Sequence, residues 1–530
     1  MILNRAAERD VDTNGRELVG NEDMQRNTVL HMAAWNNDVK TAELCLDNGC
    51  DVNTRKCNES TALHIAATKG NLEMAEFLIS LGAGVNMKDG DSKTPLHRAA
   101  LFNQTKLIAL LVEKEAKVNA RDGEGRSPFL NAVAAGHLES ASVLLKLGAD
   151  ISATDLLMKT CVHIAIENEQ LKMLDMLLES RPGTRNLNKA DLWDRYPLHY
   201  AAKTKDFKIL ELVLSKDKRL LYRDENQKTP LHIAAESSSS KHVEALVRRM
   251  SGVNMRDELG RTPLHSAARK GQRKACVTLL NMGAEVDSRD NNYRTPLIWS
   301  VKGNNLKCAQ ILLDNKASVD LQDADEDSAL HVACGLGHAD ITSLLLDRGA
   351  SLTLLNKREH TCLEVAAKAG SSDVAMTIVK HRRWVEVENY QTTTGQTTIS
   401  LLIENIPEAA EVMLNECVHH SQHLNTSDPD YTVTYNFKNL DPGPDVKDCS
   451  ARFSAVKTMI KHKRERLLLH PLTLKFNEQK WNSMGRFAFL LDFVTYLITM
   501  VLFTIFIVNQ RRGQDFRPAD YDDKPPRCQR

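Results

Sequence analysis

The chain has 530 residues, of which 42% are hydrophobic, 26% charged and 5% aromatic. This balance is typical of a helix-rich folded protein and excludes wholesale disorder and a collagen-like chain, while a mean hydropathy of −0.36 excludes a many-pass membrane protein. The 69 basic and 69 acidic residues cancel, so no global field favours nucleic acid and we expect no nucleic-acid partner.

The N-terminus lacks the basic-then-apolar order of a signal peptide, so we expect the body of the chain to stay in the cytosol. Residues 1–24 are predicted to form a partial repeat or cap. The 11 cysteines are scattered along the chain, and we expect most of them to be reduced, buried thiols.

A four-residue motif, such as Thr-Pro-Leu-His, recurs along residues 25–417, mostly in steps of 33 residues with two steps of 36. Its copies begin at Thr28, Thr61, Thr94, Ser127, Thr160, Tyr196, Thr229, Thr262, Thr295, Ser328, Thr361 and, in a degenerate form, Thr397. The motif and its period resemble the ankyrin repeat. We therefore predict an all-α repeat solenoid, a stack of about 12 helix–turn–helix units with β-turn fingers, followed by a linker and a single transmembrane helix.

Each position of the motif has a physical reason. Thr or Ser accepts a backbone N–H and caps the first helix, and Pro fits the first helical position because its missing donor would be unpaired there. Gly70 is expected to end a first helix, and the turn-forming segment Lys88–Asp91 to project as a finger.

Eight of the 18 histidines occupy the fourth position of the motif. We predict that they are structural and connect the capping hydroxyl to the backbone, because ligands spaced one repeat apart cannot converge on a metal ion. The predicted structural caps include Thr61, His64, Thr94, His97, Thr229, His232, Thr262 and His265. His419, His420 and His423 lack cysteines at metal-binding spacing and are predicted to lie in a solvated loop.

Motifs of enzymes are absent from the sequence. It has no GxGxxG, GxxxxGK[ST], HExxH, GxSxG or CxxC pattern, and no Asp-His-His-Cys segment of the kind that ankyrin-bearing protein acyltransferases carry. We therefore expect no enzyme, no catalytic or metal site and no cofactor.

Residues 418–486 are predicted to form a basic pre-membrane linker, with a short strand in Tyr431–Leu440. Between Arg452 and Arg486, nine basic residues stand against two acidic ones. Such a cluster before a membrane helix favours contact with anionic lipid headgroups or a polyphosphate; the alternative is a solvated helical face paired by neighbouring acidic loops. The candidate contacts are Lys461, Lys463, Arg464, Arg466, Lys475 and Lys480.

Residues 487–508 carry one charge, Asp492, and at 1.5 Å per residue they span roughly 33 Å, enough to cross a bilayer. We predict a transmembrane helix rather than a buried core helix. Basic residues are balanced on its two sides, so the orientation follows from the absence of a signal sequence: the N-terminal repeats are expected in the cytosol. Glycosylation at Asn58, Asn103 or Asn425 would contradict this orientation.

Asp492 is an intramembrane carboxylate that costs free energy unless it finds a partner. It either reaches the cytosolic headgroups or faces a polar residue on another membrane helix. Residues 509–530 are predicted to form a polar tail, disordered from Gly513 onward.

Four segments of the chain are distinctive: Asp430–Leu440 after the repeats, His470–Lys475, Lys480-Trp481 directly before the apolar span, and the repeat segment Cys45–Gly49. Together they resemble the ankyrin-type transient receptor potential cation channels, the TRPA subfamily. The resemblance implies a homotetrameric, calcium-permeable, nonselective cation channel with cytosolic repeats and six membrane helices, responding to chemical irritants, oxidants or temperature. This chain would then be a fragment, short isoform or incomplete gene model that lacks the pore and does not conduct alone.

The resemblance also implies electrophile-reactive cysteines between the repeats and the membrane, and only Cys417 matches one of them. A reactive thiol needs a lowered pKa, which Glu411 and Glu416 would oppose and which His419 and His420 could favour. The alternative is a buried, inert thiol.

Two functions follow from these features. The first is the cytosolic sensor region and first membrane helix of a TRPA-like channel in the plasma membrane, with other channel subunits and membrane lipids as partners. The alternative is a membrane-tethered ankyrin-repeat adaptor that binds cytosolic proteins or modulates full-length channel subunits.

Overall fold

The computed structural model describes residues 28–219, 221–237, 239–250, 252–384, 386, 397–420, 432–437, 440 and 454–514. The predicted N-terminal cap at residues 1–24 and the tail from residue 515 lie outside the described residues. The chain divides into two compact units, Met1–Ala324 and Asp325–Arg530, and each is treated by itself.

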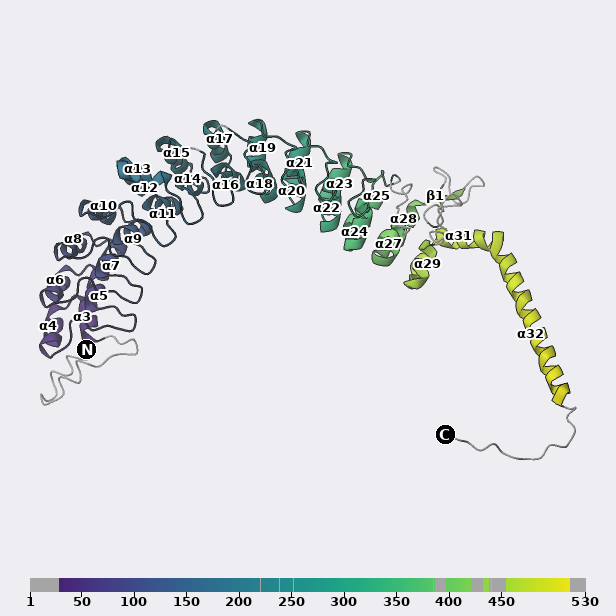
Figure 1. Cartoon of the computed structure of the whole chain (residues 1–530), viewed down its shortest axis with the longest axis horizontal. Coiled ribbons are helices and arrows are strands. Elements are labelled where there is room, and N and C mark those ends of the chain that lie inside the picture. Colours follow the sequence, from purple (N-terminus) through teal and green to yellow (C-terminus); the bar gives the residue numbers. More distant parts are fainter. Residues whose placement is uncertain are drawn as a thin grey trace, which may run out of the picture. The chain divides into compact units, whose positions relative to one another are not determined.

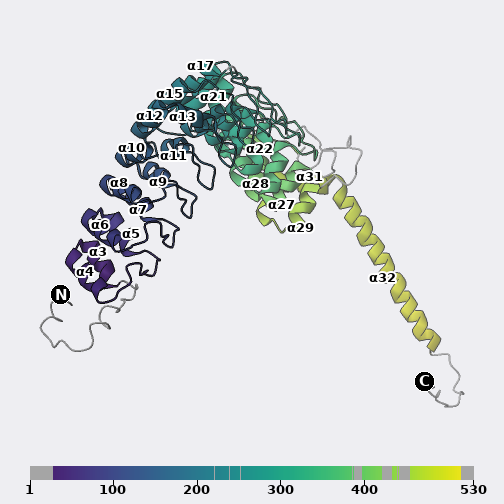
Figure 2. The same cartoon turned by 60° about the vertical axis from the view of Figure 1, so that its left-hand side comes forward.

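In the first unit, pairs of short helices alternate with loops, and Figure 1 and Figure 2 show successive pairs side by side. The helices are α3 (Val29–Asn36), α4 (Val39–Asp47), α5 (Ala62–Lys69), α6 (Leu72–Ser80), α7 (Pro95–Leu101), α8 (Thr105–Glu113), α9 (Pro128–Ala135), α10 (Leu138–Lys146), α11 (Cys161–Glu167), α12 (Leu171–Glu179), α13 (Arg181–Arg185), η1 (Asn186–Asn188), α14 (Pro197–Ala201), α15 (Phe207–Lys216), α16 (Pro230–Glu236), α17 (Ser240–Arg249), α18 (Pro263–Lys270), α19 (Arg273–Asn281), α20 (Pro296–Lys302) and α21 (Leu306–Asp314).

The second unit continues the helix pairs and then changes character. Its repeat helices are α22 (Ala329–Leu336), α23 (Ala339–Asp347), α24 (Cys362–Ala369), α25 (Ser372–Lys380), α27 (Thr398–Asn405) and α28 (Pro407–Glu416). They are followed by β1 (Val418–His420), β2 (Val433–Tyr435), α29 (Ser454–Lys461), α30 (Glu465–Leu468), α31 (Pro471–Lys480), the π-helical turn η2 (Trp481–Gly485) and α32 (Arg486–Gln514).

The core lies between neighbouring repeats. The first helix of one repeat packs on the first helix of the next, as α16 does on α18 and α18 on α20. Ala267 and Ala268 of α18 are fully buried. Their small side chains let the axes of neighbouring helices approach closely. A single helix pair could not bury its apolar stripe, whereas a stack can. The predicted all-α repeat solenoid is confirmed.

Local sequence sets where the helices begin and end. Thr262 has an extended backbone and Pro263 takes the first position of α18. Gly271 ends this helix with φ 74°, and a Cβ there would lie only 2.4 Å from the Oδ1 atom of Asn305 in the next repeat. The amide of Asn305 uses this space to donate to the carbonyl oxygens of Ala268 and Arg269, which closes the end of α18.

The first step of 36 residues runs from Thr160 to Tyr196. The residues beyond the usual period lie in α13 and η1, which follow α12. Gly183 makes this turn possible, because a Cβ would lie 1.8 Å from the carbonyl oxygen of Leu177. The hydrogen bond between neighbouring fingers is kept after the insertion: the N–H of Leu192 donates to the carbonyl oxygen of Leu157 at 3.0 Å, as the N–H of Leu156 does to that of Glu124.

One sequence prediction is wrong directly after the repeats. His419 and His420 do not lie in a loop but form β1, which pairs antiparallel with β2 through Val418↔Tyr435 and His420↔Val433. The alternating Val433–Tyr435 segment supplies the partner strand, within the stretch where a strand was predicted. His423 lies outside the described residues.

One detail of the tail prediction is also wrong, because α32 includes Gly513 and Gln514, where disorder was predicted to begin. The Gln and Arg residues of 509–514 favour a helix and continue the preceding one.

Candidate functional site

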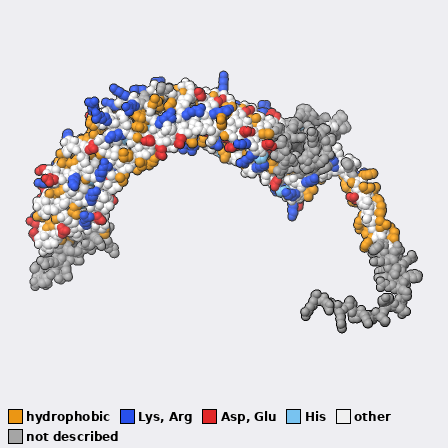
Figure 3. Space-filling view, in the orientation of Figure 1, with side chains coloured by type: hydrophobic (Ala, Val, Ile, Leu, Met, Phe, Trp, Pro, Cys, Tyr) orange, Lys and Arg blue, Asp and Glu red, His pale blue; other side chains and the backbone are white. Residues whose placement is uncertain are grey.

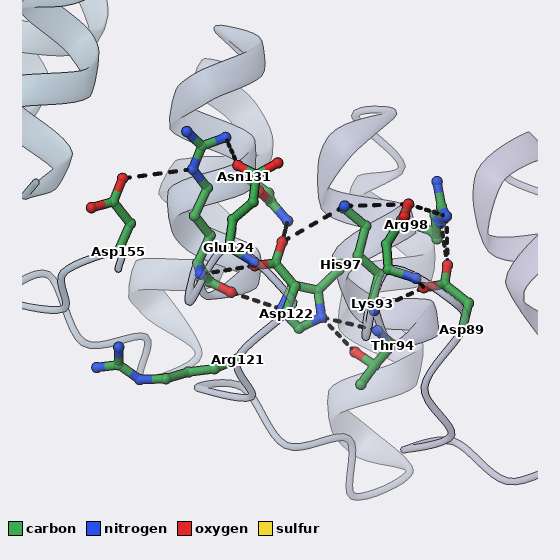
Figure 4. Close-up of polar contacts among 12 residues, drawn as sticks. Asp89, Lys93, Thr94, His97, Arg98, Arg121, Asp122, Glu124, Asn131 and Asp155 are labelled. Carbon is green, nitrogen blue, oxygen red and sulfur yellow. Dashed lines mark hydrogen bonds and ion pairs between the residues drawn. The ribbon is translucent and has the colours of Figure 1, made fainter. Parts of the chain in front are cut away.

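One histidine in most repeats links its own helix start to the next repeat. The N–H of Thr94 donates to Nδ1 of His97 at 3.1 Å, and Nε2 of His97 lies 3.0 Å from the carbonyl oxygen of Arg126 (Figure 4 shows Thr94 beside His97). A carbonyl oxygen can only accept, so Nε2 carries the proton and Nδ1 is the acceptor. Both ring nitrogens are therefore used within the fold.

The other predicted caps have the same geometry. His64 accepts from Thr61 and reaches the carbonyl of Lys93, His232 connects Thr229 to Arg261, and His265 connects Thr262 to Arg294. Burial lowers the pKa of His64, His163 and His265 to about 4, and it also lowers the pKa of His97, His199 and His232. These imidazoles are neutral at physiological pH and act as structural bridges. Among the described residues, no group of three or more His, Cys, Asp or Glu side chains is arranged to hold a metal ion.

A regular series of buried carboxylates, the aspartate ladder, stabilises the fingers, and the sequence interpretation above missed it. Oδ1 of Asp89 accepts the N–H groups of Asp91 and Lys93 at 3.0 and 2.8 Å, while Oδ2 accepts from Nε of Arg98 at 2.8 Å (Figure 4). Asp122 repeats the arrangement, with Asn131 in place of the arginine.

The signal for this ladder was in the sequence, because an acidic or amide residue stands five positions before every cap from Thr94 to Thr361, whereas Lys56 takes this place before Thr61. The series is Asp89, Asp122, Asp155, Asp191, Asp224, Asp257, Asp290, Asp323 and Asn356. These residues are buried, so the fingers are hydrogen-bonded parts of the stack rather than simple turns.

The segment after the last repeat forms a folded coupling module, which we define as β1, β2, α29, α30 and α31. It packs on the last repeat pair: α29 contacts α27, and both α30 and β1 contact α28. The predicted basic linker therefore contains a compact element joined to the repeats on one side and continuous with α32 on the other.

Arg464 fastens this module to the end of α27. Its Nη2 donates to the carbonyl oxygen of Glu404 at 2.7 Å and its Nε to that of Ile403 at 3.1 Å. Carbonyls in the last turn of a helix lack partners within the helix, and a cation there also complements the helix dipole. Arg464 was a candidate lipid contact, but its guanidinium is occupied inside the protein.

His470 makes the second attachment. Its Nδ1 accepts the N–H of Leu472 at 3.2 Å and thereby caps α31, and its Nε2 lies 2.9 Å from Oδ1 of Asn415 on α28. Burial lowers the pKa of His470, with the charge of Glu411 opposing that shift. The neutral ring thus connects the last repeat helix to the helix that precedes the membrane segment.

The remaining basic candidates differ in their surroundings. Lys461, Lys463 and Arg466 are exposed. Lys475 pairs with Glu478 at 2.9 Å, which raises the pKa of Lys475, and Nζ of Lys480 lies 5.4 Å from the centroid of the Phe476 ring. Contact of these residues with anionic headgroups or a polyphosphate stays a prediction.

Cys417 ends α28 and is fully buried. Its Sγ donates to the carbonyl oxygen of Met413 at 3.2 Å, and its own carbonyl accepts from the N–H of Asn436, which follows β2. The thiol is therefore enclosed where the last repeat meets the coupling module, while His419 is exposed on β1. This geometry favours the inert thiol over the reactive one.

In the described part of the chain, α32 is the one helix long and apolar enough to cross a membrane, over Arg486–Ile505. Figure 3 shows hydrophobic side chains along this helix, and Phe487 and Phe503 are 75% and 61% exposed. Asp492 is also exposed and makes no ion pair with the described residues. Such an apolar surface requires lipid or protein around it.

Comparisons with known proteins agree with this architecture. A family model described as ankyrin repeats (3 copies) matches residues 3–89, 82–155, 162–257, 245–323 and 315–389. The chain is also similar to two proteins named transient receptor potential cation channel subfamily A member 1. The Homo sapiens protein is 31% identical over 153 residues, and the Drosophila melanogaster protein is 27% identical over 131 residues. These alignments cover 27% and 22% of this chain but only 13% and 11% of the relatives.

Proposed function

Because this chain belongs to the ankyrin-repeat family, we propose that its solenoid is the cytosolic sensor region of a TRPA-like cation channel and that α32 is the first membrane helix. The observation that carries the proposal is the coupling module, which joins the last repeat to the membrane helix through Arg464 and His470. A sensor needs such a connection, because a displacement of the repeats must reach the membrane part.

The proposed mechanism is mechanical. A ligand, modification or temperature change that shifts α27 or α28 moves the backbone atoms that Arg464 and His470 hold. The displacement then enters α31 and passes through η2 into α32. π-Helical turns often occur at functional sites, and a five-residue one lies at this junction. Calcium permeability, chemical or thermal stimuli and assembly with other subunits belong to this proposal, as does the plasma membrane.

A chimeric channel tests the proposal. Residues 28–514 replace the corresponding region of the human relative, and cation currents are recorded at the cell surface during chemical and thermal stimulation. We expect stimulated currents, and we expect Arg464→Ala to shift the stimulus dependence without reducing surface expression. A chimera that reaches the surface but gives no current with any stimulus, while the parent channel responds, would contradict the sensor function.

The adaptor is the second candidate, and one observation favours it. Exposed apolar side chains occur on the fingers, including Leu156, Leu192 and Tyr293, which are 67%, 60% and 56% exposed. Where such side chains lie close enough together to form a patch, they mark protein contacts. The two functions differ in what purifies with the chain: channel subunits support the sensor, whereas cytosolic proteins without channel subunits support the adaptor. These 530 residues expressed alone are expected to give no cation current in either case.

A further inference from the structure

A shallow cavity of about 560 Å³, largely open to solvent, lies at the junction of the coupling module with η2. It falls within the roughly 300–1,000 Å³ of ordinary small-molecule sites. Its lining residues are Tyr435, Phe437, Lys475, Glu478, Gln479, Asn482 and Ser483. None of the proposed sensor contacts uses this cavity.

Two walls form the cavity. The first is one face of α31 and η2, since Lys475, Glu478 and Asn482 follow one another at helical spacing. The second is β2 and the residues after it, where the rings of Tyr435 and Phe437 stack with centroids 6.1 Å apart. Phe437 also contacts Phe476 on the buried face of α31, at 5.6 Å between centroids, and this contact holds the two walls together.

The cavity lies beside the predicted membrane surface. Asn482 and Ser483 are within about one helical turn, roughly 5 Å, of Arg486, where the apolar span begins. This distance matches the depth of the headgroup region. Trp481 is 49% exposed and contacts Phe489 at 5.8 Å, which is the behaviour of a residue at the membrane interface.

The cavity lining carries both a positive and a negative charge. Lys475 and Glu478 contribute one positive and one negative charge, and their side chains are 52% and 58% exposed. An exposed ion pair is weak and exchanges partners readily. The two aromatic rings offer faces that attract a quaternary ammonium group, and the amides of Gln479 and Asn482 can donate to phosphate oxygens.

We propose that this cavity binds the phosphocholine headgroup of a membrane phospholipid. The phosphate replaces Glu478 as the partner of Lys475, and the choline group lies between the carboxylate of Glu478 and the rings of Tyr435 and Phe437. A purely anionic headgroup fits less well, because it leaves Glu478 facing a second negative charge. The site differs from the anionic contact predicted for the basic cluster, and it rests on the proposed insertion of α32 into a membrane.

Lipid retention in nanodiscs tests the proposal. The full chain is inserted into nanodiscs of equal phosphatidylcholine and phosphatidylglycerol content, and the lipids that stay bound are counted by native mass spectrometry. We expect phosphatidylcholine to be retained at least about threefold over phosphatidylglycerol, and Tyr435→Leu to remove most of this preference. Glu478→Lys makes the cavity doubly positive and should invert the preference.

Glu465→Lys is the matched control, because it makes the same charge change at an exposed acid of the coupling module outside the cavity. Equal retention of the two lipids by the unchanged chain, or an equal inversion by Glu465→Lys, would overturn the proposal. A chain that inserts into nanodiscs but shows no preference leaves the membrane proposal intact. A chain that does not insert contradicts both.

A final arm separates the lipid from a soluble ligand of the same chemistry. Free phosphocholine is added to the nanodiscs at millimolar concentration. Retention of the bound lipid supports a membrane source, because the acyl chains keep the headgroup next to the cavity. Displacement of the bound lipid by free phosphocholine would identify a soluble phosphocholine site instead.

Discussion

The repeats are stabilised by contacts that recur from unit to unit, whereas the coupling module is stabilised by contacts that occur once. In the repeats the same contacts recur, so the His265 bridge to Arg294 has counterparts in His64, His97 and His232. In the module each contact occurs once, as with Arg464 and α27. Because the repeat contacts recur, each one supplies a small part of the stability of the stack. In the module, the attachment of two elements to each other depends on a single contact. Changes in the repeats should therefore reduce stability, and changes in the module should reduce coupling.

The largest effect should come from protonating the repeat histidines together. The folded pKa values of His64, His163 and His265 lie near 4, below the ordinary value of 6.5, and burial lowers the pKa of His97, His199 and His232 as well. The unfolded chain therefore binds more protons than the folded chain in this pH range. The stability that these histidines contribute is present above pH 6.5 and is lost as pH falls toward 4, by up to about 1.4 kcal/mol per pH unit for each histidine. The urea concentration at the unfolding midpoint should decrease as the pH is lowered from 7 to 4.5. A constant midpoint would contradict the lowered pKa values of the histidines.

Glu364 provides an internal contrast for this pH dependence. It replaces histidine in its repeat, accepts the N–H of Thr361 at 2.8 Å, and burial raises its pKa. Its contribution therefore has the opposite sign: stability is present below its ordinary pKa of 4.5 and is lost as pH rises through the raised value. Glu364→Gln should remove this part of the profile.

The next largest effect is expected for His265→Ala. The substitution leaves the N–H of Thr262 without its partner and removes one of the two donors to the carbonyl oxygen of Arg294, which keeps the N–H of Asp290. We expect a cost of about 2–4 kcal/mol. Hydrogen exchange should accelerate in α18 and in the following finger. His419→Ala removes an exposed imidazole and should cost less than about 0.5 kcal/mol. Equal effects of the two substitutions would contradict the bridging role.

Arg464→Ala should have a smaller effect on stability, about 1–2 kcal/mol, because the freed carbonyls of α27 are only partly buried. Its effect on coupling should be specific: exchange of the amides in α27 and α29 should accelerate while α18 stays unchanged. Arg466→Ala, at an exposed arginine two residues away, is the control. If Arg466→Ala accelerates exchange as much, the general loss of basic charge is responsible and not the Arg464 contact.

The same contrast explains what could be predicted from sequence. A 33-residue period places every cap and helix start, because each copy repeats the same local chemistry. Contacts made once leave no such pattern: Arg464 meets carbonyls 60 and 61 residues earlier, and its charge alone resembled that of a lipid contact. His419 and His420 looked like a solvated loop because the partner of β1 follows a long intervening segment. The aspartate ladder was periodic, but short loops rich in Asp and Gly were interpreted only as turns.

Glycosylation mapping tests most directly the claim that the repeats lie in the cytosol and are tethered by a spanning α32. The chain is expressed in mammalian cells with an added acceptor sequon after residue 530, and glycans are detected by their removal with an endoglycosidase. We predict that the added site carries a glycan and that Asn58 and Asn103 do not. Glycans on Asn58 or Asn103, or a chain without glycans that alkaline carbonate washes from membranes, would contradict this arrangement.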